Sequence, residues 1–161
     1  MDTKKTLLSL IKKNSRISIT DLSAALSLSE DDVFKQLSEL EDSGEIVQYT
    51  TVINDEIAFP QKIKALIELC VQPEQKLGYH SIAKRIVEHE HVVDLHLVSG
   101  HYDFLVVVEG NNLKEVSNFV SDLASIENVQ KTATHVILNT YKKLGVKLDE
   151  PQQENRLAVS P

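Results

Sequence analysis

The residue spacing between positions 16 and 52 constrains the fold of this chain more than any other feature of its sequence. A short helix opened by Thr20 is followed by a tight turn at Ser27-Leu28, and Ser29 then opens a longer helix that ends at Gly44. The apolar residues that share a face are Leu22, Ala25 and Leu26 in the first helix and Val33, Leu37 and Leu40 in the second. This pattern predicts a helix-turn-helix, a layout that usually delivers its second helix to the major groove of DNA.

The second of these helices is strongly acidic, which opposes that interpretation. Residues 29–45 hold seven acids and one base, residues 1–58 hold 11 acids and 6 bases, and the whole chain has a formal net charge of −7. DNA affinity depends largely on the neutralisation of phosphates. The alternatives therefore stay open: the helix still binds DNA, or it is a solvated face of a degenerate module, or it binds a partner protein.

Further segments complete an N-terminal winged helix-turn-helix domain, which we predict over residues 1–53. Apolar residues at helical spacing predict a first helix from Thr3 to Lys13. Residues 46–53 are rich in β-branched side chains, so we expect them to form the extended wing. Residues 54–61 include a proline and are expected to be a hinge between two domains.

Residues 62–143 show the β-α-β-β-α-β rhythm of a ferredoxin-like domain, with helices on one face of an antiparallel sheet. The predicted fold class is thus α+β. The other face of such a sheet is open, and an open apolar face favours a partner subunit. Residues 144–161 are polar and are expected to be a loose or subunit-crossing tail. The expected strands cover 63–71, 93–97, 102–109 and 130–141, and the expected helices cover 79–90 and the segment that follows Asn112.

Capping signals fix the start of two helices. Ser29 with Asp32, and Asn112 with Glu115, have the spacing of a capping box, in which the first side chain accepts a hydrogen bond from the backbone N–H three residues on. Alternation also predicts which side chains of one strand face the core, namely Val93, Leu95 and Leu97.

Composition and the single cysteine limit the remaining possibilities. With 161 residues, 42% of them hydrophobic and 25% charged, the chain is typical of soluble globular proteins. Cys70 is the only cysteine, so no internal disulfide can form, and its apolar neighbours suggest a buried core thiol. No window reaches 18 apolar residues, so we expect a cytoplasmic protein without a membrane partner.

Several motifs together resemble the Lrp/AsnC, or feast/famine, family of transcription regulators, over roughly residues 2–143. The resemblance implies homodimers that assemble further, often to octamers, and small effectors, usually amino acids, bound between effector domains. Family members typically carry several arginines along the recognition helix, and this chain does not. The matching residues are Arg16-Ile17-Ser18, Leu28-Ser29, Leu40-Glu41, Gly44-Glu45-Ile46, the G-x-Y-D hairpin within Val98-Ser99-Gly100-His101-Tyr102-Asp103, and Thr132-Ala133-Thr134.

Seven residues are candidates for contact with double-stranded DNA. Lys35, Gln36 and Ser38 remain on the acidic helix to meet base edges, and Gln36 can read adenine. Bases near the first helix can hold phosphates. The full set is Lys12, Lys13, Arg16, Ser29, Lys35, Gln36 and Ser38.

The hairpin around Gly100 is the candidate effector site. Glycine permits a tight turn with positive φ and lets a ligand carboxylate approach backbone N–H groups, while Asp103 can take an α-ammonium group. The alternative is a purely structural hairpin with Tyr102 in the sheet core. The candidate residues are Ser99, Gly100, Tyr102, Asp103, Thr132 and Thr134.

We expect no enzyme activity, no cofactor and no metal site. Six histidines are present, but the single cysteine and the lack of a compact Cys/His set make a zinc site a poor interpretation. The GxGxxG, P-loop, HExxH and GxSxG motifs are missing from the sequence. A histidine such as His96 or His101 near a subunit contact can still make assembly sensitive to pH.

The hypothesis that follows is a cytoplasmic, homo-oligomeric and sequence-specific transcription regulator controlled by an amino acid. The alternative is an amino-acid-sensing oligomer whose acidic helix-turn-helix no longer binds DNA and contacts a protein partner.

Overall fold

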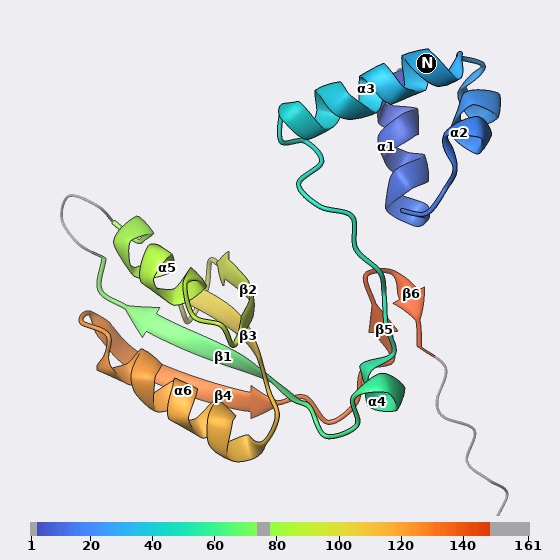
Figure 1. The fold of residues 1–161 in the computed structure, drawn as a ribbon. Helices are drawn as coiled ribbons and strands as arrows, with labels where there is room; N and C mark the ends of the chain where they lie inside the picture. The colour runs from blue at the N-terminus through green and yellow to red at the C-terminus, as the bar shows by residue number, and fades with distance from the viewer. Residues whose placement is uncertain (1–2, 74–77, 149–161) are drawn as a thin grey trace, which may run out of the picture. The chain divides into compact units, whose positions relative to one another are not determined.

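The computed structural model describes residues 3–73 and 78–148, and the chain divides into two compact units, Met1–Val52 and Ile53–Pro161 (Figure 1). The first unit is helical, and the second contains the antiparallel sheet. No helix in the described part of the chain is both long and apolar enough to cross a lipid bilayer.

Three helices form the N-terminal unit, as the spacing predicted: α1 (Thr3–Lys13), α2 (Ile19–Leu26) and α3 (Glu30–Asp42). Because each helix turns its apolar stripe inward, five side chains are removed from water and form one core. That core consists of Leu7, Ile11, Leu22, Val33 and Leu40.

The turn and the caps of this unit follow from single residues. Ser27 takes the left-handed conformation with φ of 55°, and Gly44 follows α3 with φ of 73°. The predicted cap of α3 is confirmed, because Ser29 Oγ accepts a hydrogen bond from Asp32 N at 3.1 Å. The prediction that Thr20 opens α2 is wrong. Ser18 is extended and its hydroxyl accepts from Asp21 N at 3.0 Å, so the helix begins one residue before Thr20.

The predicted wing is wrong as a strand, because residues 47–54 have no regular secondary structure. A strand needs a neighbour for its backbone N–H and C=O groups, and the described residues of this unit contain only helices besides this segment. Thr50 O accepts a hydrogen bond from Ser15 Oγ at 3.0 Å, while the Val47 side chain is 90% exposed.

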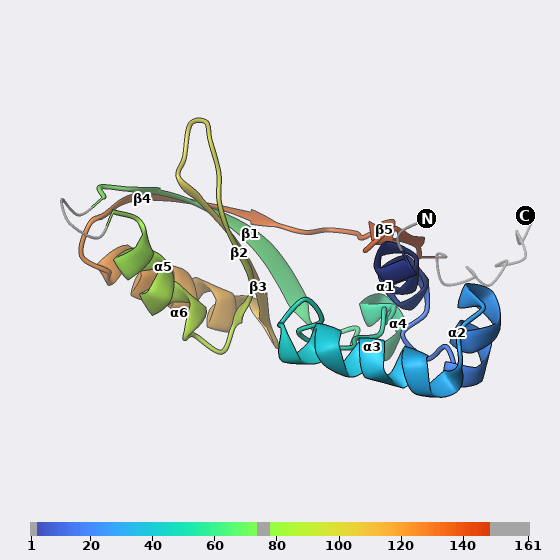
Figure 2. The same ribbon diagram turned by 90° about the horizontal axis from the view of Figure 1, so that it is seen from above.

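The C-terminal unit has the predicted ferredoxin-like order β1-α5-β2-β3-α6-β4, preceded by the one-turn helix α4 (Asp55–Ala58) within the expected hinge. The sheet is antiparallel with strand order β2-β3-β1-β4, and both α5 and α6 cover the same face of it (Figure 2). No helix of the described residues covers the other face (Figure 2). The bounds are β1 (Ile63–Val71), α5 (His80–Val87), β2 (Val92–Leu97), β3 (Phe104–Gly110), α6 (Leu113–Ser125) and β4 (Val129–Val136).

The core of this unit lies between the sheet and its two helices. Strict alternation along β1 buries Ala65, Ile67, Leu69 and Val71 on the covered face. Cys70 therefore belongs to the open face and is only half-buried, so the expected core thiol is wrong. The cap of α6 is confirmed, since Asn112 Oδ1 accepts from Glu115 N at 3.0 Å.

The predicted inward face of β2 is also partly wrong, because of a bulge. The register of β2 against β3 shifts between Val92 and Asp94, and a bulge adds one residue to the strand and so changes which side chains face inward. Val92 and Leu95 pack against the core, whereas the Val93 side chain is 54% exposed. Leu97 pairs with the buried Phe104 and so faces the same side as Leu95, but it lies at the end of an edge strand and its side chain is 57% exposed.

The last strand is shorter than predicted. β4 ends at Val136, opposite Ala65, and the final link is the hydrogen bond from Ile137 N to Lys64 O at 2.9 Å. Of β1 only Ile63 lies beyond this point, and residues 137–141 leave the sheet. The short strands β5 (Lys142–Lys143) and β6 (Val146–Lys147) then form a small hairpin within the start of the expected tail. Residues 149–161 of that tail lie outside the described residues.

Candidate functional site

The α3 helix packs one stripe of residues against the core and exposes a different set on its outward face. Successive helical residues are 100° apart, so the stripe of Val33, Leu37 and Leu40 leaves Lys35 and Ser38 on the opposite side. Lys35 is exposed and Ser38 is half-buried. Both lie on the face of α3 that points away from the core of this unit. Asp31 and Asp42 share this outward face.

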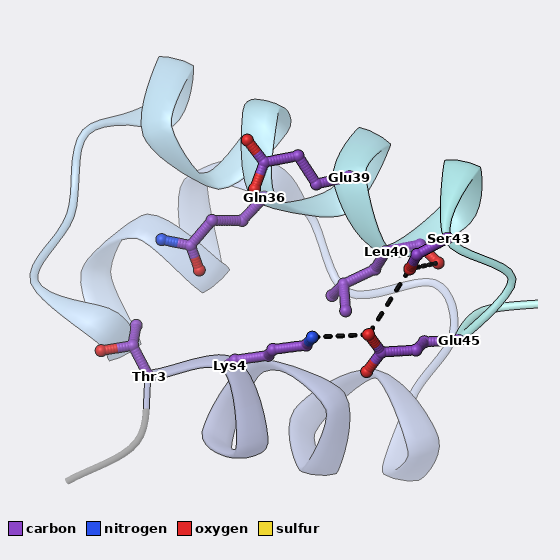
Figure 3. A pocket seen from close by; sticks show the side chains of 7 residues that line it. All are labelled: Thr3, Lys4, Gln36, Glu39, Leu40, Ser43 and Glu45. Atoms are coloured by element: carbon purple, nitrogen blue, oxygen red, sulfur yellow. Dashed lines mark hydrogen bonds and ion pairs between the residues drawn. The ribbon is translucent and has the colours of Figure 1, made fainter.

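Gln36 does not share the outward face with Lys35. It lies on the flank of α3 that turns toward α1, where it lines a pocket of 480 Å³ together with Thr3, Lys4 and Glu39 (Figure 3). The Lys4 ammonium forms an ion pair with Glu45 at 2.5 Å along this pocket. The structure therefore brings Lys35 and Ser38 together and separates Gln36 from them.

Three acids around α3 are held by hydrogen bonds, each from a neighbouring hydroxyl. Because these bonds fix the carboxylates in place, part of the acidity of α3 has a structural role in caps and helix contacts. The three pairs are Thr20 Oγ1 to Glu30 Oε1 at 2.7 Å, Ser29 Oγ to Asp32 Oδ2 at 2.6 Å, and Tyr49 Oη to Glu41 Oε1 at 2.7 Å. Burial and the bond to the Glu41 carboxylate raise the pKa of Tyr49 to about 12.

The remaining DNA candidates lie on different elements. Lys12 and Lys13 are exposed in the last turn of α1, and Arg16 is exposed in the loop before α2. All three side chains are accessible to a polyanion. Ser29 is also exposed, but its hydroxyl is used by the cap of α3.

One residue of α3 was missed by the sequence reasoning. The Phe34 side chain is 60% exposed, although phenylalanine is usually buried. Its signal was present in the spacing, because Phe34 falls outside the stripe of Val33, Leu37 and Leu40. A large apolar ring thus lies on the same helix as the base-contact candidates.

In the C-terminal unit, Asp103 is a structural junction. Its carboxylate accepts hydrogen bonds from Val71 N at 2.8 Å and from Tyr79 Oη at 3.0 Å, and its own N–H donates to Leu69 O at 2.8 Å. The bond to Asp103, with a contribution from burial, raises the pKa of Tyr79. Both carboxylate oxygens are therefore engaged within the chain, which ties β1 and the start of α5 to the β2–β3 hairpin.

The hairpin itself is exposed at its tip. Val98 N donates to Asp103 O at 2.8 Å and closes the loop, and Gly100 has a φ of 143° with open space where a Cβ would point. Figure 2 shows this loop projecting beyond the sheet on the side away from α5 and α6. Ser99 is exposed, and Tyr102 is half-buried and lies outside the core cluster.

The two threonine candidates lie at the same end of the sheet as the hairpin. Thr132 and Thr134 on β4 pair with Leu69 and Ile67, and Leu69 also pairs with Phe104, the residue after Asp103. Two strand spacings, about 10 Å, therefore separate Thr132 from Phe104. Their pairing with the buried residues Leu69 and Ile67 places Thr132 and Thr134 on the face that α5 and α6 cover, whereas the hairpin projects on the other side (Figure 2). The structure therefore does not bring the two threonines together with Ser99 and Gly100.

A second polar cluster was not predicted from the sequence. The Asp55 carboxylate on α4 accepts hydrogen bonds from Lys64 and from Lys143 at 2.7 Å, and Lys64 also lies 3.4 Å from Glu109, which pairs with Lys62. Burial acts to raise the pKa of Asp55, but the bonds from Lys143 and Lys64 outweigh it and lower that pKa. These contacts fasten α4 to the sheet and to β5.

The histidines are distributed rather than gathered. His89 lies against the Phe119 ring with 4.3 Å between centroids, and His135 Nε2 is 3.2 Å from Glu68 Oε1 on the open sheet face. His96 and His101 are exposed. Within residues 3–73 and 78–148, no three His, Cys, Asp or Glu side chains are grouped as metal ligands.

Two known family models match this chain, one over each of its two units. The family model described as the Lrp/AsnC ligand binding domain matches residues 64–146. The family model described as winged helix-turn-helix DNA-binding matches residues 2–47. Together the two matches cover both units of the structure.

Individual relatives match over nearly their whole length. The uncharacterized HTH-type transcriptional regulator YugG of Bacillus subtilis is 30% identical over 157 residues, which are 96% of this chain and 95% of the relative. The HTH-type transcriptional regulator FL11 of Pyrococcus furiosus is 28% identical over 142 residues, covering 88% of this chain and 91% of FL11.

Solved structures share the fold. The transcriptional regulator NMB0573 of Neisseria meningitidis, in complex with L-Met, superposes with a TM-score of 0.73 at 23% identity and covers 92% of this chain and 96% of its own. A feast or famine regulatory protein of M. tuberculosis, complexed with L-methionine, gives a TM-score of 0.73 at 21% identity, with coverage of 88% and 94%.

Proposed function

We propose that this chain, which belongs to the Lrp/AsnC family, is a transcription regulator that binds specific DNA sequences under the control of an amino acid. The observation that carries the proposal is that one chain joins a helix-turn-helix unit to a domain of the Lrp/AsnC ligand-binding type. Relatives named as HTH-type transcriptional regulators align over almost the full chain, which supports the same function.

In this proposal, α3 enters the major groove with Lys35 and Ser38 toward the base edges. Lys12, Lys13 and Arg16 contact phosphates, because their exposed cations are the groups that such contacts require. The acid excess of the helix-turn-helix unit weakens each subunit's affinity, so binding by several subunits together supplies much of the total. Half-sites about one helical turn apart are expected for a dimer.

The effector in this proposal is an amino acid bound near the β2–β3 hairpin. Backbone N–H groups around Gly100 receive the ligand carboxylate, and Ser99 supplies a hydroxyl group. Two structural neighbours named as complexes with L-methionine support this ligand class. The Asp103 carboxylate already holds two internal hydrogen bonds, so we propose that it positions the hairpin and leaves the α-ammonium to other acceptors.

The open face of the sheet is proposed to pair with a second copy of the chain. It carries the half-buried side chains of Leu66, Leu105 and Val107, which alternate with the core residues of β1 and β3. Burial of such a face against an identical one removes apolar surface from water. The ligand then binds at a subunit boundary and favours one assembly geometry, with dimers assembling to a larger oligomer such as an octamer.

The test is the capture of genomic DNA fragments by the purified protein at low and at physiological salt. Enriched fragments that share a pseudo-palindrome support the proposal, and capture should fall steeply as salt rises. The double reversal Lys12→Glu/Lys13→Glu should abolish capture. The matched control is Lys84→Glu/Arg85→Glu, which reverses two exposed bases in the last turn of α5 and should leave capture unchanged.

The second candidate function is an amino-acid sensor that has lost DNA binding. The acidic, exposed surface of α3 favours it, because phosphates repel Asp31 and Asp42. Absence of enriched DNA at both salt concentrations, together with a rise in melting temperature on addition of L-methionine or another amino acid, would select this candidate.

A further inference from the structure

Phe34 is an exposed aromatic residue on the helix that we propose to enter the major groove. Its side chain is 60% exposed, while Val33 beside it is completely buried. Leu37 on the same helix packs against the core, whereas the Phe34 ring lies outside the residues that do so. The core of this unit therefore gives no packing reason for the ring.

The position of Phe34 on α3 points it away from α1. Glu30, Phe34 and Glu41 fall within one strip of the helix surface, since their positions lie within about 40° of one another at 100° per residue. The acids at both ends of this strip are hydrogen-bonded, Glu30 to Thr20 of α2 and Glu41 to Tyr49. These hydrogen bonds hold the two carboxylates in place on either side of the ring. Of the three side chains, only the Phe34 ring is not engaged in such a contact.

The opposite flank of α3 is unsuitable for reading bases. Gln36 faces the pocket beside α1, so the amide that can read adenine is turned from the outward face (Figure 3). Sequence discrimination then depends on the side chains that remain outward, which are Phe34, Lys35 and Ser38.

The chemistry of the ring selects one feature of the groove. A phenyl ring has no hydrogen-bonding group, and the 5-methyl group of thymine is the apolar feature that the major groove offers. An uncharged ring also reaches the bases without the repulsion that the neighbouring acids meet. We propose that Phe34 is a specificity-determining residue that packs against a thymine methyl group in each half-site, an inference that rests on the proposed DNA-binding function.

The experiment begins with selection of duplexes from a random library by the wild-type protein. The selected duplex is then remade with uracil in place of one thymine at a time, which removes only the methyl group. Affinities of the wild type and of Phe34→Ala are measured for each duplex. Val47→Ala is the matched control, because Val47 is an apolar residue of the same unit with an exposed fraction of 90%.

For the wild type, uracil at one position in each half-site should weaken binding about fourfold per half-site, the value of one buried methyl group. Phe34→Ala should bind the thymine duplex about tenfold more weakly and should not respond to uracil at that position. Circular dichroism should show unchanged folding, because the ring is exposed.

Three results would contradict the inference. If Phe34→Ala keeps both the affinity and the uracil response of the wild type, the ring does not read thymine, and the proposed function stands. The inference also fails alone if Val47→Ala changes the uracil response as strongly as Phe34→Ala does. If the wild type selects no sequence, the proposed function itself fails, and the exposed ring is then assigned to a contact with protein.

Discussion

Tyr79 donates its hydroxyl hydrogen to a carboxylate oxygen of Asp103, with 3.0 Å between the two oxygens. Tyr79 lies just before α5, and Asp103 precedes β3 by one residue, so the bond joins the helical layer to the end of the sheet. The ring of Tyr79 also meets Phe104 edge to face, with 5.8 Å between centroids. The hairpin with Gly100 is therefore held from its base while its tip stays exposed.

Replacing Asp103 should destabilise the C-terminal unit in the absence of any ligand. Asp103→Ala leaves the half-buried Val71 N–H without its acceptor, and we expect a loss of about 2–4 kcal/mol of unfolding free energy. Asp103→Asn keeps one acceptor and should cost less. Hydrogen exchange of the β1 and β3 amides measures the effect in this unit alone. Unchanged exchange in Asp103→Ala would contradict the structural role. Asp103 would then again be a candidate for direct binding of the effector's α-ammonium group.

Features of the fold that depend only on neighbouring residues could be predicted from the sequence. Ser29 and Asn112 begin helices because a cap needs only the N–H three residues on, and the alternation along β1 reads out its buried face without any other strand. The bulge at Val93 depends on how β2 pairs with β3, and a wing strand would need a second strand to pair with. Periodicity within one segment contains no information about such partners, so both features escaped prediction.

The stability of the α4 attachment should depend on pH in the acid range. The pKa of Asp55 is lower in the folded chain than its ordinary value of 3.8, so as the pH falls the unfolded state takes up the proton first. The contribution of Asp55 is therefore full above about pH 5 and is lost as the pH falls below 3.8 through the folded pKa. The pKa of Glu109 is also lowered, so its contribution to stability is likewise lost as the pH falls.

Asp55→Asn tests this dependence. At pH 7 it should reduce the unfolding free energy of the C-terminal unit by about 1 kcal/mol, because the carboxylate is only partly exposed and pairs with two lysines. At pH 3, below the ordinary pKa of 3.8, the difference between the variant and the wild type should be smaller than at pH 7. A difference that is independent of pH between 3 and 7 would show that charge on Asp55 does not hold α4.

Ser29 should affect DNA binding only indirectly, by stabilising the N-terminus of α3. Ser29→Ala removes the acceptor of Asp32 N and should cost about 1 kcal/mol of stability in the N-terminal unit. Ser29→Asn retains a capping oxygen and should restore most of that stability. If DNA binding follows stability across the two variants, the hydroxyl has a structural role. If Ser29→Asn is stable but binds DNA weakly, Ser29 makes a direct contact.

The DNA-contact candidates show where sequence reasoning about the site ended. Lys35 and Gln36 are adjacent in the sequence, yet 100° of helix separates them, and only Lys35 points outward. Phe34 was passed over because apolar residues are expected in cores, although its position outside the inward stripe already indicated exposure. For Asp103 the residue type suggested a ligand for ammonium, and only the three-dimensional contacts revealed that Val71 and Tyr79 occupy it.

Tyr49 should titrate unusually late. Burial and the bond to Glu41 raise its pKa from 10.0 to about 12, so the stabilisation from this bond is full below pH 10 and is lost as the pH rises to about 12. Absorbance titration of the phenolates should show a step near pH 12 that disappears in Tyr49→Phe. Glu41→Gln should move that step to lower pH. A late step that persists unchanged in Glu41→Gln would contradict the role of the carboxylate.

Neutralising the outward acids of α3 should strengthen DNA binding. Asp31 and Asp42 lie on the same face as Lys35, and within the described residues neither forms a hydrogen bond or ion pair. Their charges therefore face the approaching phosphates unshielded. Asp31→Asn and Asp42→Asn should each raise affinity about threefold at low salt, and the gain should shrink at physiological salt because screening acts on exposed charges.

The matched control for these variants is Glu39→Gln, which removes one negative charge from the flank that lines the pocket beside α1. It changes the net charge by the same amount as Asp31→Asn but acts from the flank of α3 beside the pocket, so its gain in affinity should be smaller. Fluorescence anisotropy with one labelled duplex at two salt concentrations compares all three variants. Equal gains for Glu39→Gln and Asp31→Asn would mean that total charge, rather than the outward face of α3, governs binding. A gain for none of the three would show that α3 does not approach phosphates.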